Sequence, residues 1–488
     1  KKFNSKFSFS NDRYSIFHDT SRITKFMVPL AIFLVTVIGN FIVMKDFPLS
    51  ADEALIKFQA DCYRQFKIGG ILPTNLVPTH NIFFLSYQYY NESSTGWTSQ
   101  YLPVYAFFYA VLSTANLEFL LGAIMNCVSL VMVWHIAKIL WPQDKELPWI
   151  CVIFLGSSSQ FLITGMTYYT MNGHLAINLI WLWLFLKNKT WATLLLPWVG
   201  ALAIGMHQPH IHAHMAIPCL LLVPFKKKWW ETAYIVIIYL LACYIWYSFL
   251  THVRNSDPNE IMNQSLGLPS AISIIVRLMN VFLLINWSNI VAGLLCIYAL
   301  NRYKNMPFSI RLIALSFIVS FFFYLLFPGT GGHGWGSRYS HCILGHMVLL
   351  AGYGYQLLKE FLCHNLLKRF VCVFTLFALL IQLPLRCYQS SSFVTPYARL
   401  FDHISTLDVD YVGIKFLEGY YVLDMVRNDP FFRNRPIFFR SNNTDLKEKL
   451  GLEDETVTYI GAEEFKKFGI PLTDPEEIER VREMGLID

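Results

Sequence analysis

The stretch FMVPLAIFLVTVIGNFIVMKDFPLSADEA, residues 26–54, decides the class of fold. Its apolar part, residues 26–44, carries no charge and has about the 20 residues of helix that cross the hydrocarbon layer of a membrane. In the polar part that follows, Ser50 stands three residues before Glu53, which is the pattern of a helix-capping box. The stretch therefore predicts a transmembrane helix followed at once by a second helix of another kind.

The composition of the whole chain agrees with a membrane protein. Of its 488 residues, 55% are hydrophobic and 15% are charged, against about 25% charged in ordinary globular proteins. So little charge cannot cover a water-soluble surface, and collagen-like, disordered and disulfide-framework proteins are excluded as well. The ten cysteines form no C-x-x-C pair and are expected to pack as small apolar residues. Nucleic acid is not expected as a partner, because no basic stripe is interleaved with aromatic residues.

Ten further apolar segments follow the first one. The sequence therefore predicts an all-α polytopic membrane protein with about 11 transmembrane helices. The predicted spans are residues 26–44, 117–140, 149–164, 168–186, 191–206, 212–225, 230–250, 287–300, 310–327, 340–358 and 370–385.

Lysine and arginine gather at alternate connections between these spans, and this sets the predicted orientation. Residues 1–25 are expected to be cytoplasmic, residues 26–386 to form the transmembrane domain, and residues 387–488 to form an extracytoplasmic domain. The chain is then a multi-pass protein of the plasma (inner) membrane, with its N-terminus in the cytoplasm and its C-terminal domain in the periplasm or outside the cell.

The first outer loop, residues 45–116, is the longest connection in the membrane part, and long loops are often functional. Its runs 54–66 and 102–112 are helical but too short to cross, so both are predicted to be interfacial helices. A distorted crossing is the alternative for residues 102–112. Residues 272–284 are a candidate for a third interfacial helix.

The C-terminal domain carries the signals of a small α/β fold. Residues 435–439 and 456–460 read as strands. Asp474 precedes Pro475 as the N-cap precedes the first residue of a helix, which predicts a helix from there.

The first candidate for chemistry is the pair Asp52 and Glu53, which lies just beyond the first span. A carboxylate beside low-dielectric hydrocarbon has a raised pKa, in the range that suits a general base. A purely structural interpretation is also open, because Ser50 and Glu53 make a capping box.

The second candidate is the glycine-rich loop of residues 329–339, which ends in Gly336-Ser337-Arg338-Tyr339. Glycines let backbone N–H groups approach an anion, and Arg338 can hold a phosphate through two hydrogen bonds. The alternative is a connecting loop with an interfacial arginine.

The third candidate is a cluster of histidines. Residues 207–214 contain four of them, and imidazole is the commonest metal ligand. Pro209 breaks the helix there, so the alternatives are metal or substrate contact by some of them, His207 and His210 first, or interfacial hydrogen bonding. His174 is a polar residue in an apolar run and is expected to face the interior of the protein.

Four motifs, taken in this order and on this side of the membrane, resemble those of C-type (GT-C) glycosyltransferases. They are residues 50–54, residues 96–103, Gly173-His174 and residues 336–339. The chain looks like the bacterial branch of this family that is related to protein O-mannosyltransferases and lipid A aminoarabinose transferases.

The resemblance implies a function and a set of site residues. Asp52, with Glu53 beside it, would activate an acceptor hydroxyl, while Arg338, Tyr339 and His333 would hold the phosphate of a polyprenyl-phosphate sugar. The substrate-binding residues would be Trp97, Gln100, Tyr101 and His174. A divalent metal ion beside Asp52 is the one cofactor that the resemblance implies, while the histidine density alone makes His207 and His210 candidate metal ligands; a metal-free route is the alternative. The acceptor would be a glycan, a lipid or a protein.

Two rival functions fit part of the sequence. A glycan ligase or polymerase would use a lipid-pyrophosphate donor, also held by an outer arginine. A transporter or flippase of lipid-linked sugars is less well matched, because the chain has no internal repeat and its predicted spans are almost free of charge at their centres.

Overall fold

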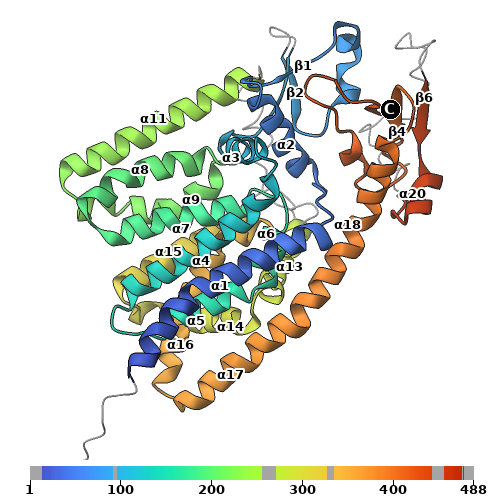
Figure 1. Ribbon diagram of the computed structural model, residues 1–488. Coiled ribbons are helices and arrows are strands. Elements are labelled where there is room, and N and C mark those ends of the chain that lie inside the picture. Colours follow the sequence, from blue (N-terminus) through green and yellow to red (C-terminus); the bar gives the residue numbers. More distant parts are fainter. Residues whose placement is uncertain are drawn as a thin grey trace, which may run out of the picture.

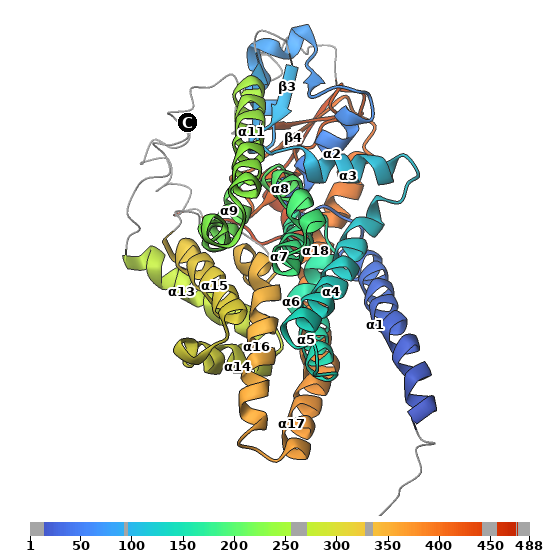
Figure 2. The same cartoon turned by 90° about the vertical axis from the view of Figure 1, so that its left-hand side faces the viewer.

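The computed structural model describes residues 14–91, 96–254, 271–326, 335–441, 456–474 and 476. Its helices form a bundle, and two small sheets lie together at one end of it, opposite the turn between α16 and α17 (Figure 1). Both views agree on this arrangement (Figure 2). His333 and most of the glycine-rich loop lie outside the described residues, as does most of the helix predicted from Asp474.

Each of the predicted spans coincides with one or two helices of the bundle. These are α1 (Tyr14–Ile42), α4 (Leu121–Leu140), α5 (Leu147–Gly156), α6 (Ser159–Gly165), α7 (Met171–Lys187), α8 (Thr190–Ile204), α9 (His210–Leu220), α10 (Val223–Lys226), α11 (Trp229–Arg254), α14 (Ile290–Leu300), α15 (Phe308–Leu326), α16 (Leu344–Lys359), α17 (His364–Phe377) and α18 (Leu383–Ser405). The candidate interfacial segment 272–284 coincides with a further helix, α13 (Ala271–Trp287).

Fewer of these helices are long enough to cross a membrane than the sequence predicts. Within the described residues, four are long and apolar enough, or up to six if each bent pair counts as one span. The four are Glu118–Leu140, Trp229–Val253, Phe308–Leu326 and His364–Ser405.

The two bent pairs have a local cause in polar caps. Helices α5 and α6 meet at 59°, where the Ser158 side chain accepts a hydrogen bond from Phe161 N and starts a new helix. Between α13 and α14 the bend is 119°, and there Asn289 caps the second helix. Hydropathy alone does not register these breaks, because it measures the polarity of a segment and not its direction.

The last predicted span continues beyond its predicted end. Helix runs without a break from His364 to Ser405, through a π-helical turn at Ala378–Gln382. The predicted boundary between residues 386 and 387 therefore lies inside this helix, which leads from the bundle to the sheets at the far end (Figure 1).

The first outer loop folds into two helices and a small antiparallel sheet. The helices are α2 (Ala51–Tyr63) and α3 (Val104–Ser113), and between them lie the 3-10 helix η1 (Thr74–Phe83) and the strands β1 (Gly70–Ile71), β2 (Gln88–Asn91) and β3 (Gly96–Ser99), in the order β1-β3-β2. The two predicted short helices are present. Helix α2 begins earlier than predicted, because Ser50 caps it, and protein rather than lipid buries most of its residues.

The C-terminal part contains a parallel sheet in the order β5-β4-β6. Its strands are β4 (Tyr411–Ile414), β5 (Ile437–Arg440) and β6 (Val457–Ile460), accompanied by η6 (Val422–Met425) and α20 (Ala462–Phe468). The two strands predicted from sequence, β5 and β6, are confirmed.

The two sheets share one apolar core. Trp97 of β3 packs on Phe58, Phe84 and Phe432, with ring centroids 4.6, 4.8 and 5.2 Å away. Phe439 of β5 belongs to the same cluster. Residues separated by more than 300 positions thus form a single layer over α2.

Candidate active site

The structure brings together the two residues that sequence analysis ranked highest. Asp52 lies in the first turn of α2, and Arg338 directly precedes the 3-10 helix η4 (Tyr339–Ile343). The Arg338 Nη2 forms an ion pair with Asp52 Oδ2, and the two side chains are only 12% and 9% exposed. Burying an ion pair is costly unless every remaining polar atom is also satisfied, so a buried pair of this kind suggests a site kept for function.

The second carboxylate oxygen of Asp52 has its own partner. The Tyr101 hydroxyl donates a hydrogen bond to Asp52 Oδ1. Burial raises the pKa of Tyr101, so its hydroxyl remains protonated and acts as the donor. Asp52 is therefore held from both sides, by Arg338 and by Tyr101.

Aromatic rings enclose the guanidinium of Arg338. It lies 4.9 Å from the ring centroid of Tyr169 and 5.5 Å from that of Tyr339, distances that allow cation–π attraction. Tyr339 stacks in turn on Tyr324, with centroids 5.8 Å apart. Burial lowers the pKa of Arg338, yet a guanidinium keeps its charge in any protein. The site thus offers a fixed cation beside a carboxylate.

The backbone before Arg338 is fixed on α6. Gln160 accepts from Ser337 N and donates to Ser337 O, each at 2.8 Å. Gly336 has φ +72°, and a Cβ there would lie 2.2 Å from Gln160 Oε1. Only glycine fits this position, so the Gly-Ser-Arg sequence has a geometric reason.

Glu53 serves as the predicted cap. Its Oε2 accepts from Ser50 N at 3.2 Å, and its Oε1 accepts from Tyr168 N at 3.0 Å. Burial raises the pKa of Glu53 to about 7, against the pull of these hydrogen bonds and of Arg427. Glu53 thus forms the cap of the structural interpretation, while Asp52 pairs with Arg338 and its catalytic role stays a prediction.

Two of the histidines lie beside Tyr101. The His207 ring lies tilted by 33° against the Tyr101 ring at a centroid distance of 3.8 Å, and the His174 ring is 6.2 Å from that of His207. Both imidazoles are buried, and in the described part of the chain neither has a hydrogen-bond partner. Burial lowers the pKa of His207 to about 3, so its ring is neutral.

The remaining histidines of the turn point elsewhere. His212 bonds to Asn178 and Tyr239, His214 bonds to Ser320 and Tyr324, and His210 stacks on Phe323. Among the described residues, no group of three or more His, Cys, Asp or Glu side chains gathers in a way that could hold a metal ion. Within this part of the chain, the donor groups therefore do not assemble the metal site predicted at His207 and His210.

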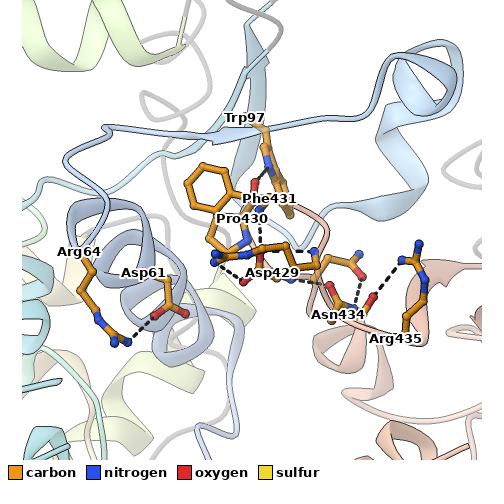
Figure 3. A network of polar contacts seen from close by, with 10 residues as sticks. Asp61, Arg64, Trp97, Asp429, Pro430, Phe431, Asn434 and Arg435 are labelled. Atoms are coloured by element: carbon orange, nitrogen blue, oxygen red, sulfur yellow. Dashed lines mark hydrogen bonds and ion pairs between the residues drawn. The ribbon is translucent and has the colours of Figure 1, made fainter. Parts of the chain in front are cut away.

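Two other predicted substrate residues, Trp97 and Gln100, make hydrogen bonds of their own. Trp97 is buried in the shared core and donates its Nε1 hydrogen to Pro430 O at 2.8 Å (Figure 3). Gln100 accepts from the Tyr89 hydroxyl at 3.5 Å. The position of Trp97 favours packing over substrate contact.

Sequence analysis missed several residues that shape the site. Gln160 and Tyr169 hold and flank Arg338, and Asp424 of the C-terminal part accepts from Ala51 N at the start of α2. No local motif marks any of them, since each reaches the site only through the tertiary fold.

Known structures share this fold, although no protein-family model and no curated protein sequence matches the chain. The crystal structure of ArnT from Cupriavidus metallidurans bound to undecaprenyl phosphate matches with a TM-score of 0.56 at 12% identity, over 95% of this chain and 94% of that chain. Its apo form matches with the same TM-score at 11% identity, over 95% of both chains. The chain has the GT-C fold.

A further match carries lower similarity. The Archaeoglobus fulgidus oligosaccharyltransferase in complex with Zn and sulfate has a TM-score of 0.45 at 11% identity, over 83% of this chain and 62% of that chain. The GT-C resemblance drawn from four short motifs is thus confirmed at the level of the fold by the ArnT structures.

Proposed function

We propose that this protein is a membrane glycosyltransferase that moves a sugar from a polyprenyl-phosphate donor to an acceptor hydroxyl. The observation that carries the proposal is the buried pair of Asp52 and Arg338 on a GT-C fold. The undecaprenyl phosphate bound to ArnT supports a lipid phosphate as the donor's carrier. The acceptor is a glycan, a lipid or a protein on the outer face of the membrane.

Arg338 binds the donor phosphate in this proposal. Without substrate its guanidinium pairs with Asp52, and the phosphate replaces Asp52 as its partner when the donor binds. A guanidinium can bind a phosphate through two hydrogen bonds and keeps its charge when buried. The Tyr339 ring lies beside the same guanidinium, and His333, which lies outside the described residues, stays a predicted contact of the phosphate.

Asp52 acts as the base once Arg338 has turned to the phosphate. It accepts the proton of the acceptor hydroxyl, whose oxygen forms a bond to the anomeric carbon of the donor sugar. The bond from that carbon to the phosphate oxygen breaks, and the phosphate leaves with the electron pair. Arg338 stabilises the charge that develops on the leaving phosphate, and the sugar is transferred with inversion.

Glu53, Tyr101 and His174 support this centre. Glu53 caps α2 and so fixes the turn that carries Asp52. Tyr101 orients the carboxylate through its hydrogen bond, and His174 and Gln100 are proposed as contacts of the substrate.

The proposed location is the plasma (inner) membrane, with the N-terminus in the cytoplasm. Asp52 and Arg338 then lie at the outer surface, where a lipid-linked donor presents its phosphate at the interface and its sugar to the water. Both sheets lie at the same end of the bundle, which agrees with this orientation (Figure 1).

The donor class can be tested directly with purified protein in nanodiscs. A panel of polyprenyl-monophosphate sugars and a panel of polyprenyl-pyrophosphate glycans, each carrying a labelled sugar, are supplied with membrane extract as the source of acceptor. We expect label in a new product from a monophosphate donor alone. Turnover only with pyrophosphate donors identifies a ligase or polymerase instead, and movement of intact donor across the bilayer without a new product identifies a transporter.

A further inference from the structure

Helix α2 carries Asp52 in its first turn, and the chain enters this turn through residues 49–51. The first N–H groups of a helix have no partner within the helix and need one from elsewhere. Ser50 Oγ accepts from Glu53 N at 3.4 Å, and Glu53 Oε2 accepts from Ser50 N. Neither bond satisfies Ala51 N.

The missing partner comes from the C-terminal part of the chain. Asp424, in η6, accepts from Ala51 N through Oδ2 at a distance of 3.0 Å. Its side chain is 9% exposed, and a carboxylate at a helix N-terminus is also favoured by the helix dipole. The N-terminus of α2 is thus completed by a residue 373 positions away.

Arg427 binds the other side of the same turn. Its Nη2 donates to Leu49 O at 2.9 Å, and its Nε donates to the backbone carbonyl of Asp424. The guanidinium stacks on Phe47 and Phe401, 4.5 and 5.2 Å from their ring centroids. Arg427 therefore ties the residue before the cap to the turn that supplies Asp424.

The residues that follow continue the attachment. Asn428 Nδ2 donates to Phe83 O at 3.0 Å, and Pro430 O accepts from Ile71 N at 2.8 Å. Asp429 lies near Asp61, which pairs with Arg64 at the end of α2 (Figure 3). It accepts two hydrogen bonds of 3.0 Å from Arg433. The segment 424–433 thus contacts the residue before the cap, the first residue of α2, and the elements β1 and η1 that follow α2.

These contacts leave α2 little freedom to turn about its own axis. A rotation would break the bonds to Ala51 N and Leu49 O and would carry Asp52 away from both Tyr101 and Arg338. Catalysis is sensitive to such displacements, since misplacement by about 1 Å can cost 100-fold in rate.

We infer that Asp424 and Arg427 are positioning residues of the reaction centre, which hold the first turn of α2 so that Asp52 faces Arg338. The C-terminal part is then a component of the active site and not an attached binding module. This inference rests on the proposed function for its catalytic consequence, while the positioning of α2 can be tested without turnover.

The test compares Asp424→Ala and Asp424→Asn with Asp402→Asn, which alters an exposed aspartate of α18. Hydrogen exchange is followed in peptides that cover residues 49–56, and transfer is measured with a polyprenyl-monophosphate sugar. We expect Asp424→Ala to speed exchange at the start of α2 by at least tenfold and to lower kcat by at least tenfold with a smaller change in KM. Asn retains an acceptor oxygen for Ala51 N, so Asp424→Asn restores part of both.

Each result decides one part of the inference. Unchanged exchange in Asp424→Ala overturns the positioning of α2, and fast exchange with wild-type kcat overturns its role in the reaction. Arg427→Lys, which keeps a charge but loses the planar fork, serves as a second variant if Asp424→Ala fails to fold; it is expected to speed exchange too, and unchanged exchange overturns the inference. If the wild type transfers no sugar, the proposed function fails, while the exchange data still decide whether the C-terminal part positions α2.

Discussion

Asp52 and Arg338 are the two residues for which sequence reasoning and structure converge. The sequence marked Asp52 by its place after a transmembrane segment and Arg338 by the glycines before it. Neither sequence feature predicts that the two side chains are in contact, because Asp52 and Arg338 are separated by 286 positions. Tyr101 was expected to touch substrate, and the structure adds that its hydroxyl binds Asp52.

The first prediction concerns the charge of Arg338. Replacing it by Ala removes the only described cation that pairs with Asp52, and we expect undecaprenyl phosphate to bind at least tenfold more weakly. Arg338→Lys keeps a point charge without the planar fork and should fall between the two. Binding is measured by displacement of a labelled lipid phosphate in nanodiscs. Arg399→Ala, at an exposed position of α18, is the control, and equal affinity in Arg338→Ala would remove Arg338 from the donor site.

The second prediction concerns the proton on Glu53. The folded protein keeps its carboxyl protonated up to a pH of about 7, whereas the unfolded chain releases that proton near 4.5. The folded state therefore binds more protons between these values, and its stability falls as the pH rises through them, by at most about 1.4 kcal/mol per pH unit.

Glu53→Gln removes this titration. The loss of thermal stability caused by Glu53→Gln should be larger at pH 5 than at pH 8, since only the wild type gains stability from protonation. Asp424, whose pKa burial raises to about 6, titrates in both proteins and cancels in the comparison. A stability difference that is the same at both values of pH argues against a raised pKa at Glu53.

At the scale of elements, hydropathy located the helices but not their ends. Residues 386–405 are polar enough to end the predicted span, yet α18 continues to Ser405. Hydropathy indicates whether a segment lies in lipid or in water, whereas a helix can form in either medium. Apolar periodicity placed the start of α2 at residue 54, three residues late, whereas the capping-box pattern of Ser50 and Glu53 predicted the start that the structure shows.

The third prediction concerns the attachment of the Arg338 segment to α6. Gln160→Leu leaves Ser337 N and O buried without partners, at a cost of about 1–3 kcal/mol for each group. We expect Arg338 to lose its fixed position and transfer to fall at least tenfold, as measured with a polyprenyl-monophosphate sugar. Gly336→Ala should act in the same direction through its clash with Gln160. Gln389→Leu, at an exposed position of α18, is the control, and equal activity in all three variants contradicts the attachment.

At the scale of the molecule, the charge of the connections predicted which ends of the helices lie together. The first outer loop and the C-terminal part, both predicted outside, do lie at one end. Their shared core around Trp97 and Phe432 could not be foreseen, because apolar residues in two distant segments carry no information about each other's position. The same holds for Asp424 and Arg427.

The fourth prediction concerns the orientation of the whole molecule. Cys363 lies exposed in the turn between α16 and α17, at the end opposite the two sheets. In a variant where Cys363 is the sole thiol, we expect an impermeant maleimide to label it only after the cells are opened. With Asp408→Cys as the sole thiol, labelling should occur in intact cells. The reverse pattern would place the C-terminal part in the cytoplasm.

The central claim is that Asp52 takes the proton of the acceptor while Arg338 holds the donor phosphate. The decisive experiment measures single-turnover transfer of a labelled sugar from a polyprenyl-monophosphate donor and compares the wild type with Asp52→Asn. We expect Asp52→Asn to bind undecaprenyl phosphate at least as tightly as the wild type, because Arg338 no longer pairs with a carboxylate. The rate of transfer should fall by at least 100-fold, because the acceptor hydroxyl has lost its base. If Asp52→Asn transfers sugar at the wild-type rate, Asp52 is not the base of the reaction.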